Sequence, residues 1–170
     1  PVNVQGDMAY RKQQLSLAGL NLRSGPNHLQ LQGQAWPKFN LGMTLDMPNL
    51  AMLWPGLQGQ STGAGRLTGD SNNPALVGIF SGHQLGYADY RLAKIKADLN
   101  WSAGAEESAR SQIDIEGLQT PNGNWDSGQL LLQGTPASHS LQGSLKGDIL
   151  NADLRASGGL HQGNWKGKLE

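Results

Sequence analysis

Apolar and polar residues alternate along most of the chain. Leu29, Leu31 and Gly33 are spaced by two, and the same apolar-x-apolar-x-Gly pattern recurs at Leu130, Leu132 and Gly134. The longest run extends from Phe39 to Met47. A period of two places every apolar side chain on one face of a strand and the polar ones on the other. The pattern predicts an all-β protein of about ten to twelve antiparallel strands with one wetted face.

Turn residues separate these runs. Ser24–Asn27, Pro121–Asn124 and Asp70–Pro74 carry the Gly, Pro, Asn and Asp of tight turns, and Asn122-Gly123 favours a hairpin turn with positive φ. The stretch 102–111 has no periodicity and is predicted to be a loop.

One segment departs from the strand period. Leu50, Leu53 and Trp54 recur at helical spacing, Asn49 stands at the expected N-cap, and Pro55-Gly56 follows. The sequence predicts one short helix near 49–54. It would either cover a sheet end or serve as a lid or docking element.

Composition refines the fold class. The 170 residues include 24 Gly, and only 15% are charged. Glycine at strand ends lets a sheet curl, and leucine and methionine make a more adaptable wall than valine and isoleucine. We therefore expect one domain over residues 1–170, a curled antiparallel sheet forming a trough-like open barrel with an apolar interior.

Charge excludes several function classes. The 13 Lys+Arg balance the 13 Asp+Glu, giving a formal net charge of +0. A nucleic-acid binder or a basic membrane-surface helix would need a cationic excess. No apolar run approaches the roughly 18 residues of a spanning helix.

Catalytic and metal-binding constellations are not found in the sequence. The histidines are far apart and lack the spacing of zinc motifs; they are His28, His83, His139 and His161. We expect no catalytic residue, no metal, no cofactor and no enzymatic activity.

Other candidate motifs have simpler interpretations. The serines at Ser24-Gly25 and Ser81-Gly82 lack the nucleophile elbow, and the glycines of 56–69 lack a phosphate-loop ending. Glu106-Glu107 is expected at a solvated loop tip. The aromatic residues are expected to cover strand ends rather than to stack sugars; they are Trp36, Trp101 and Trp125.

The apolar stripe is the candidate site. It is either an ordinary packed core or an open trough for acyl chains or unfolded β strands. An unpaired edge strand could also accept an extended chain. The predicted lining residues are Leu15, Leu17, Leu29, Leu31, Phe39, Leu41, Met43, Leu45, Leu67, Leu92, Leu99, Ile113, Ile115, Leu130, Leu132, Leu141, Leu145 and Leu154.

An ordered set of segments resembles the C-terminal region of the TamB family. The set covers roughly residues 15–169: 53–59 (LWPGLQG), 63–69 (GAGRLTG), 73–76 (NPAL), 85–87 (LGY), 90–92 (YRL), 134–141 (GTPASHSL) and 163–167 (GNWKG). No single one of these motifs is specific for the family. The resemblance rests on the order in which they follow one another along the chain.

The resemblance implies a segment of a long periplasmic β protein anchored in the inner membrane of a Gram-negative envelope. TamB-like proteins are similar to bridge-type lipid transfer proteins and pair with TamA, an outer-membrane barrel. The implied function is to carry phospholipid acyl chains between the membranes in a hydrophobic β-groove, in support of outer-membrane biogenesis. The alternatives are a chaperone-like groove or edge for outer-membrane β-barrel and autotransporter assembly with TamA, and a structural β-solenoid.

Overall fold

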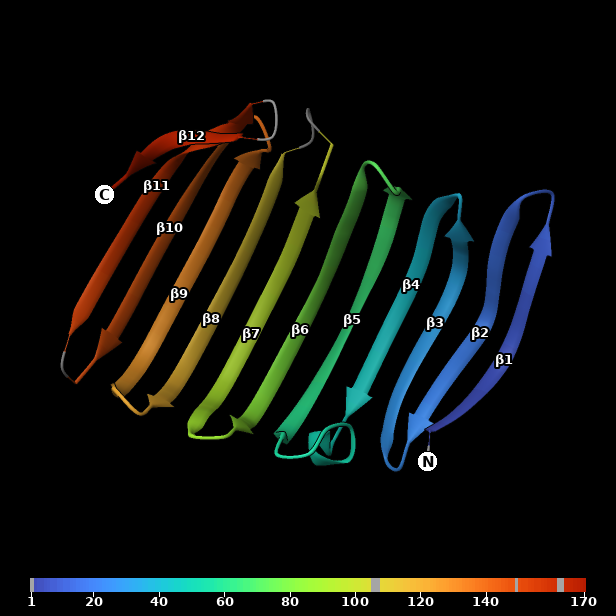
Figure 1. Cartoon of the computed structure of the whole chain (residues 1–170), viewed down its shortest axis with the longest axis horizontal. Helices are drawn as coiled ribbons and strands as arrows, with labels where there is room; N and C mark the ends of the chain where they lie inside the picture. Colours follow the sequence, from blue (N-terminus) through green and yellow to red (C-terminus); the bar gives the residue numbers. More distant parts are fainter. Residues whose placement is uncertain (1, 105–107, 149, 162–163) are drawn as a thin grey trace.

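The computed structural model describes residues 2–104, 108–148, 150–161 and 164–170. It contains one twelve-stranded antiparallel sheet in which the strands follow one another in sequence order (Figure 1). The elements are β1 (Val2–Arg11), β2 (Gln14–Ser24), β3 (Asn27–Trp36), β4 (Lys38–Met47), η1 (Leu50–Met52), β5 (Gln58–Asp70), β6 (Pro74–Tyr87), β7 (Tyr90–Ser102), β8 (Ala109–Thr120), β9 (Gly123–Thr135), β10 (Ser138–Gly147), β11 (Asn151–His161) and β12 (Asn164–Leu169). The predicted all-β meander is confirmed.

The sheet is a single layer with two open edges, β1 and β12. Its accessible surface is 11192 Å², whereas a compact monomer of 18.1 kDa is expected to expose about 8,100 Å². Among the described residues, the buried hydrophobic side chains are Leu17 and Ala109. The packed-core interpretation is therefore wrong, because no second layer among the described residues covers the apolar face.

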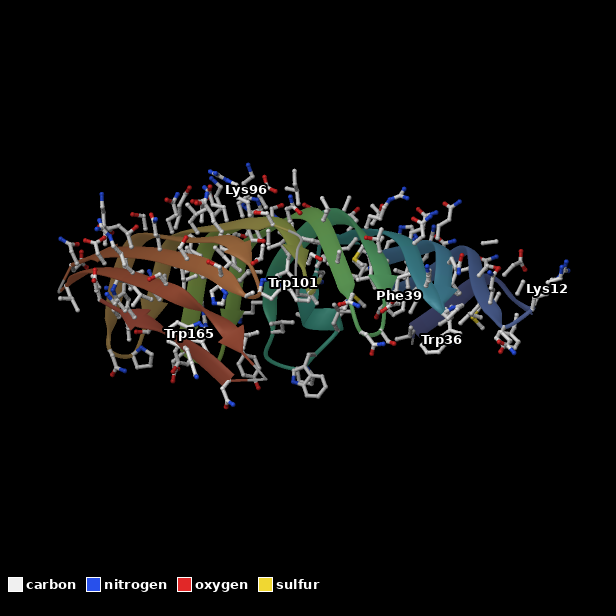
Figure 2. All side chains as sticks on the ribbon, turned by 90° about the horizontal axis from the view of Figure 1, so that it is seen from above. Lys12, Trp36, Phe39, Lys96, Trp101 and Trp165 are labelled. Atoms are coloured by element: carbon white, nitrogen blue, oxygen red, sulfur yellow. The ribbon has the colours of Figure 1, made fainter. Side chains whose placement is uncertain are left out.

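The sheet is arched and unclosed, which confirms the predicted curled trough. In Figure 2, Lys96 projects from the outer side of the arch, while Trp36, Trp101 and Trp165 project from the other side. We call the side that carries these tryptophans the apolar face and the side that carries Lys96 the polar face.

Glycine permits local bends inside the strands. Gly33 has a φ of +126° and Gly134 a φ of +115°, both outside the range that most residues adopt. A Cβ at Gly33 would collide with the carbonyl oxygen of Asn40, and one at Gly134 with that of Ser138. These glycines let β4 approach β3 closely at Gly33 and let β10 approach β9 closely at Gly134.

The predicted turns are confirmed in position, with one difference in detail. The β2–β3 turn is Gly25-Pro26, and Gly25 has a φ of +59°. In the β5–β6 turn, the Asp70 carboxylate accepts hydrogen bonds from the backbone N–H groups of Asn72 and Asn73. The β8–β9 turn uses Pro121-Asn122 rather than Asn-Gly, since Gly123 already belongs to β9 and its φ is +154°.

The predicted short helix is confirmed as a 3₁₀ turn, but its expected cap is wrong. Asn49 makes no side-chain cap hydrogen bond. Instead its backbone N–H donates to Oδ1 of Asn27, at 3.0 Å, and its carbonyl accepts from Nδ2 of Asn27, at 2.7 Å. Met52 of η1 lies against Gly25 in the β2–β3 turn. The turn therefore packs on the sheet end.

The stretch 102–111 is shorter as a loop than the sequence predicts. Strand β7 continues to Ser102 and β8 begins at Ala109, because Ala109 and Ser111 extend the alternation of β8 and are both buried. Glu106 and Glu107 lie outside the described residues.

Candidate functional site

A continuous apolar row crosses the sheet from β1 to β11. Cross-strand partners lie on the same face of an antiparallel sheet, so the pairing fixes which side chains are neighbours. The row consists of Val4, Leu22, Leu29, Leu45, Gly63, Phe80, Ala97, Ile113, Leu130, Gly143 and Leu154. It contains no polar side chain. At about 4.8 Å per strand, it extends for roughly 48 Å.

Parallel rows widen the surface. One contains Leu20, Leu31, Met43, Gly65, Gly78 and Leu99, and another contains Ile95, Ile115, Gly128, Leu145 and Ala152. The register thus places the predicted lining residues on one face. Leu92, beyond a local irregularity, lies opposite Leu85, whose side chain packs over Gly82 beside Ile95.

These lining residues are only partly covered. Leu17 is 8% exposed, but Leu130 and Leu154 are 37% and 38% exposed, and the others are of intermediate burial. A leucine in a filled core is usually far less accessible. The face therefore offers apolar surface that nothing in the described chain covers.

Glycine forms part of the floor of this surface. On β5, the apolar face carries Gly63 and Gly65, and the ring of Phe80 lies over both of them and over Gly78. Phe80 therefore fills the space that absent side chains leave at the middle of the sheet.

A hollow of about 360 Å³ lies on the apolar face between β8 and β11. The side chains of Ile115 and Leu145 stand on either side of Gly128, which forms its floor. Leu130 and Leu154 line the same hollow. Its volume falls in the range of small-ligand pockets, and its apolar lining suits a hydrocarbon chain.

Sequence reasoning missed several residues of the apolar face. Phe80 follows Ile79, and alternation cannot assign a face where two consecutive residues are both apolar. Leu20 and Leu22 fall out of phase with Leu17 because the register shifts near Gly19. A glycine inside a strand pattern was the available signal for such a shift.

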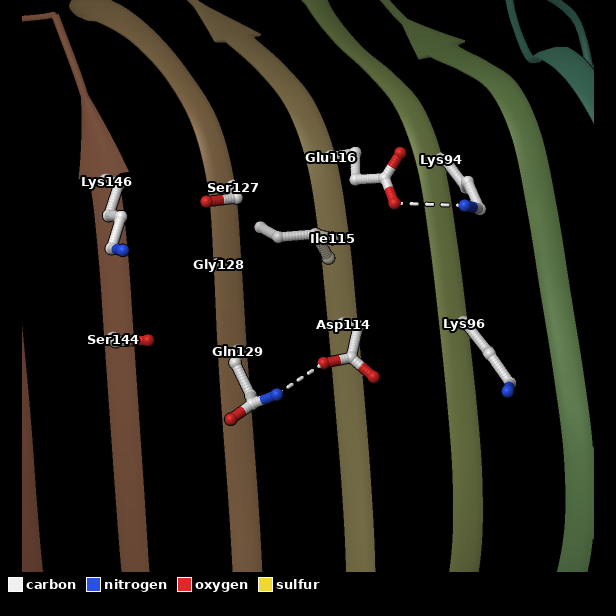
Figure 3. Close-up of a pocket in the computed structure, with 10 residues that line it drawn as sticks. All are labelled: Lys94, Lys96, Asp114, Ile115, Glu116, Ser127, Gly128, Gln129, Ser144 and Lys146. Carbon is white, nitrogen blue, oxygen red and sulfur yellow. Dashed lines mark hydrogen bonds and ion pairs between the residues drawn. The ribbon is translucent and has the colours of Figure 1, made fainter.

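The polar face carries a mixed-charge pocket of about 440 Å³ between β7 and β10 (Figure 3). Lys94 Nζ and Glu116 Oε1 form an ion pair at 2.9 Å, and the amides of Gln129 and Gln112 donate to Asp114. These amide hydrogen bonds lower the pKa of Asp114. The side chains of Lys94 and Glu116 are 47% and 59% exposed, so this face is a solvated surface. Exposed ion pairs of this kind contribute about 0–1 kcal/mol to stability.

His28 and His139 lie on different strands, β3 and β10. His28 Nε2 lies 2.9 Å from Oδ1 of Asn21, and His139 contacts Trp165. Among the residues that the structure describes, no group of three or more His, Asp or Glu could hold a metal. The aromatic residues Trp36 and Trp101 lie at or near the ends of their strands, and Trp125 near the start of β9.

The outer edge strand β1 is exposed throughout. Val2, Val4, Met8 and Tyr10 each expose between 59% and 67% of their surface. Such an edge is able to pair with another extended chain.

Two comparisons bear on this geometry. The family model described as "TamB, N-terminal domain" matches residues 1–170. It corresponds to the N-terminal domain, so the expected correspondence to the C-terminal region is wrong. No solved structure matches the chain significantly. Within the described ranges, no helix is long and apolar enough to cross a membrane.

Proposed function

Since this chain belongs to the TamB family, a family of envelope transport and assembly proteins, we propose that it is a segment of a conduit for phospholipid acyl chains. The conduit would lie in the periplasm and carry lipid between the inner and outer membranes. The observation that carries the proposal is the uncovered apolar row from Val4 to Leu154.

The energetics of acyl chains fit such a surface. Each methylene shielded from water contributes about 0.8 kcal/mol, so a dozen gain roughly 10 kcal/mol before entropy losses. The affinity of a carrier for acyl chains must match that of the membrane rather than exceed it, because otherwise lipid would not leave the carrier. A row without polar anchors favours sliding over tight capture.

The test compares a charge on each face of one strand. Leu132→Glu puts a carboxylate on the apolar face, whereas Leu131→Glu puts one among Gln112, Gln142 and other polar-face neighbours. We expect Leu132→Glu to reduce phospholipid transfer between donor and acceptor vesicles at least tenfold, and Leu131→Glu to have little effect. Leu41→Arg is a second apolar-face variant with the same expected loss. Circular dichroism checks that the variants fold.

A second function is favoured by the exposed β1 edge. As a chaperone-like segment working with TamA, the chain would bind unfolded outer-membrane β strands by strand addition at β1. Crosslinkers at Val2 or Tyr10 would then capture such strands, while lipid capture at Leu132 alone would count against this function. The β-solenoid hypothesis finds no support, because consecutive strands are antiparallel neighbours in one sheet rather than stacked coils.

A further inference from the structure

Trp165 and His139 form a polar contact on the apolar face. The indole Nε1 of Trp165, in the edge strand β12, donates a hydrogen bond to Nε2 of His139 in β10, at 3.0 Å. The two residues belong to strands that do not pair, since β11 lies between them. In Figure 2, Trp165 projects from the side opposite to Lys96.

Glycine makes this reach across β11 possible. Gly158 pairs with His139 on one side and with Gly167 on the other. A Cβ at Gly158 would lie 2.8 Å from Cζ2 of the Trp165 ring, and one at Gly167 would also collide with the ring. The indole therefore lies over bare backbone and covers β11 at this point.

The contact defines the protonation state of His139. An indole N–H can only donate, so Nε2 must accept and carry no hydrogen. Nδ1 lies 3.3 Å from the carbonyl oxygen of Thr135, which can only accept, so Nδ1 carries the hydrogen. The imidazole is thus neutral in this arrangement. Protonation would place a second N–H at Nε2, facing the N–H of Trp165, and would remove the acceptor.

No charged side chain of the described residues faces His139 on this face. Its neighbours are Gly134 and Thr135 from β9, Gly158 from β11, and Trp165 and Gly167 from β12. Arg155, Lys166 and Lys168 alternate onto the polar face. His161, also in β11, is the other histidine of this region of the sequence.

We propose that His139 and Trp165 form a proton-sensitive flap on the apolar face. The neutral imidazole holds the indole over β11, and protonation of His139 releases it and uncovers the part of the apolar face between β10 and β12. Histidine is suited to this because its charge ordinarily changes between about pH 5 and 8. The effect on lipid rests on the proposed conduit function, whereas the proton-sensitive contact does not.

The direct test follows the fluorine resonance of Trp165 in the 5-fluorotryptophan-labelled chain, assigned with Trp165→Phe. We expect one transition as the pH is lowered, in which the resonance of the released indole replaces that of the held indole. His139→Gln keeps an acceptor oxygen without titrating, so its Trp165 resonance should not change. His161→Gln should keep the wild-type response. A flat wild-type titration, an unchanged transition in His139→Gln, or its loss in His161→Gln would overturn the flap.

A second readout separates the flap from the conduit. Leu160 pairs with Trp165, so a benzophenone at position 160 reports on the surface below the indole. Lipid labelling from phosphatidylethanolamine vesicles should rise severalfold from about pH 7.5 to 5.5 in wild type and stay constant in His139→Gln. Labelling that is detectable and equal at both pH values in wild type would overturn the flap. Failure to label at any pH, with the fluorine transition intact, would contradict the conduit function instead.

Discussion

The side chain of Asn27 makes two reciprocal hydrogen bonds with the backbone of Asn49. Asn27 is 1% exposed and is the one fully buried large side chain of the described residues. It ties the start of β3 to the segment that leads into η1. In a sheet without a filled core, a single buried amide thus fixes the β4–β5 connection.

Asn27→Ala removes the hydrogen bonds that its side chain makes with the N–H and C=O of Asn49. The carbonyl keeps the backbone N–H of Met52 as a donor, but the N–H is left unpaired, which costs about 1–3 kcal/mol. We therefore expect the free energy of unfolding to fall by about 2 kcal/mol. Urea denaturation measures this change. Asn49→Ala is the matched control: the side chain makes no cap hydrogen bond, so its effect should stay within about 0.5 kcal/mol. Equal losses in both variants would contradict this role of Asn27.

Gly33→Ala should destabilise the sheet more than Gly42→Ala does. Gly33 has a positive φ, and its added Cβ would meet the carbonyl oxygen of Asn40, whereas a Cβ at Gly42 would lie an ordinary 3.6 Å from the Gln32 oxygen. We expect Gly33→Ala to lower the free energy of unfolding by about 1–3 kcal/mol. Gly42→Ala should leave it nearly unchanged or raise it. Thermal unfolding of the two variants gives the comparison, and a reversed order would refute it.

Truncations on the apolar face should be milder than in a packed core. Leu17→Ala, at the best-covered leucine, should cost about 2–3 kcal/mol. Leu130 is 37% exposed. Leu130→Ala should lower the free energy of unfolding by only about 1 kcal/mol, because much of the leucine surface already contacts water. Chemical denaturation of both variants tests the single-layer architecture. A loss of 4 kcal/mol or more at Leu130, about that of a fully buried leucine, would mean that another layer covers it.

Asp70 should give the β5–β6 turn a pH dependence. Backbone hydrogen bonds from Asn73 and Asn72 lower its pKa, so the ionised form stabilises the turn above the unfolded-state pKa of about 3.9. That contribution is lost as the pH falls through the lower pKa of the folded state. Wild type should therefore be more stable than Asp70→Asn near neutral pH, with the difference disappearing in strong acid. Denaturant titrations across this range measure the difference, and a constant gap would exclude the mechanism.

Alternation in the sequence was sufficient for the class of fold. It predicted the strand number, the meander and the apolar face, because leucines spaced by two must share a face in any regular strand. Asp70–Pro74 and Ser24–Asn27 were equally predictable from turn chemistry. These are local properties that need no partner strand.

Other features depend on how strands meet and were not predictable. Leu20 and Leu22 join the apolar face only because of a register shift beside Gly19. The contact between His139 and Trp165 requires bare backbone at Gly158 of β11 and at Gly167 of β12, which no spacing rule reveals. Asn49 was expected to cap η1 through its side chain, but the buried amide of Asn27 binds its backbone instead.

The most direct test of the conduit uses three consecutive leucines of β9. Leu130 and Leu132 lie on the apolar face, and Leu131 lies between Gln112 and Gln142 on the polar face. A photocrosslinker at each position, exposed to radiolabelled phospholipid vesicles, should capture lipid at 130 and 132 and give at most a tenth of that signal at 131. Equal labelling at all three positions, or labelling only at 131, would contradict the claim that the apolar face carries lipid.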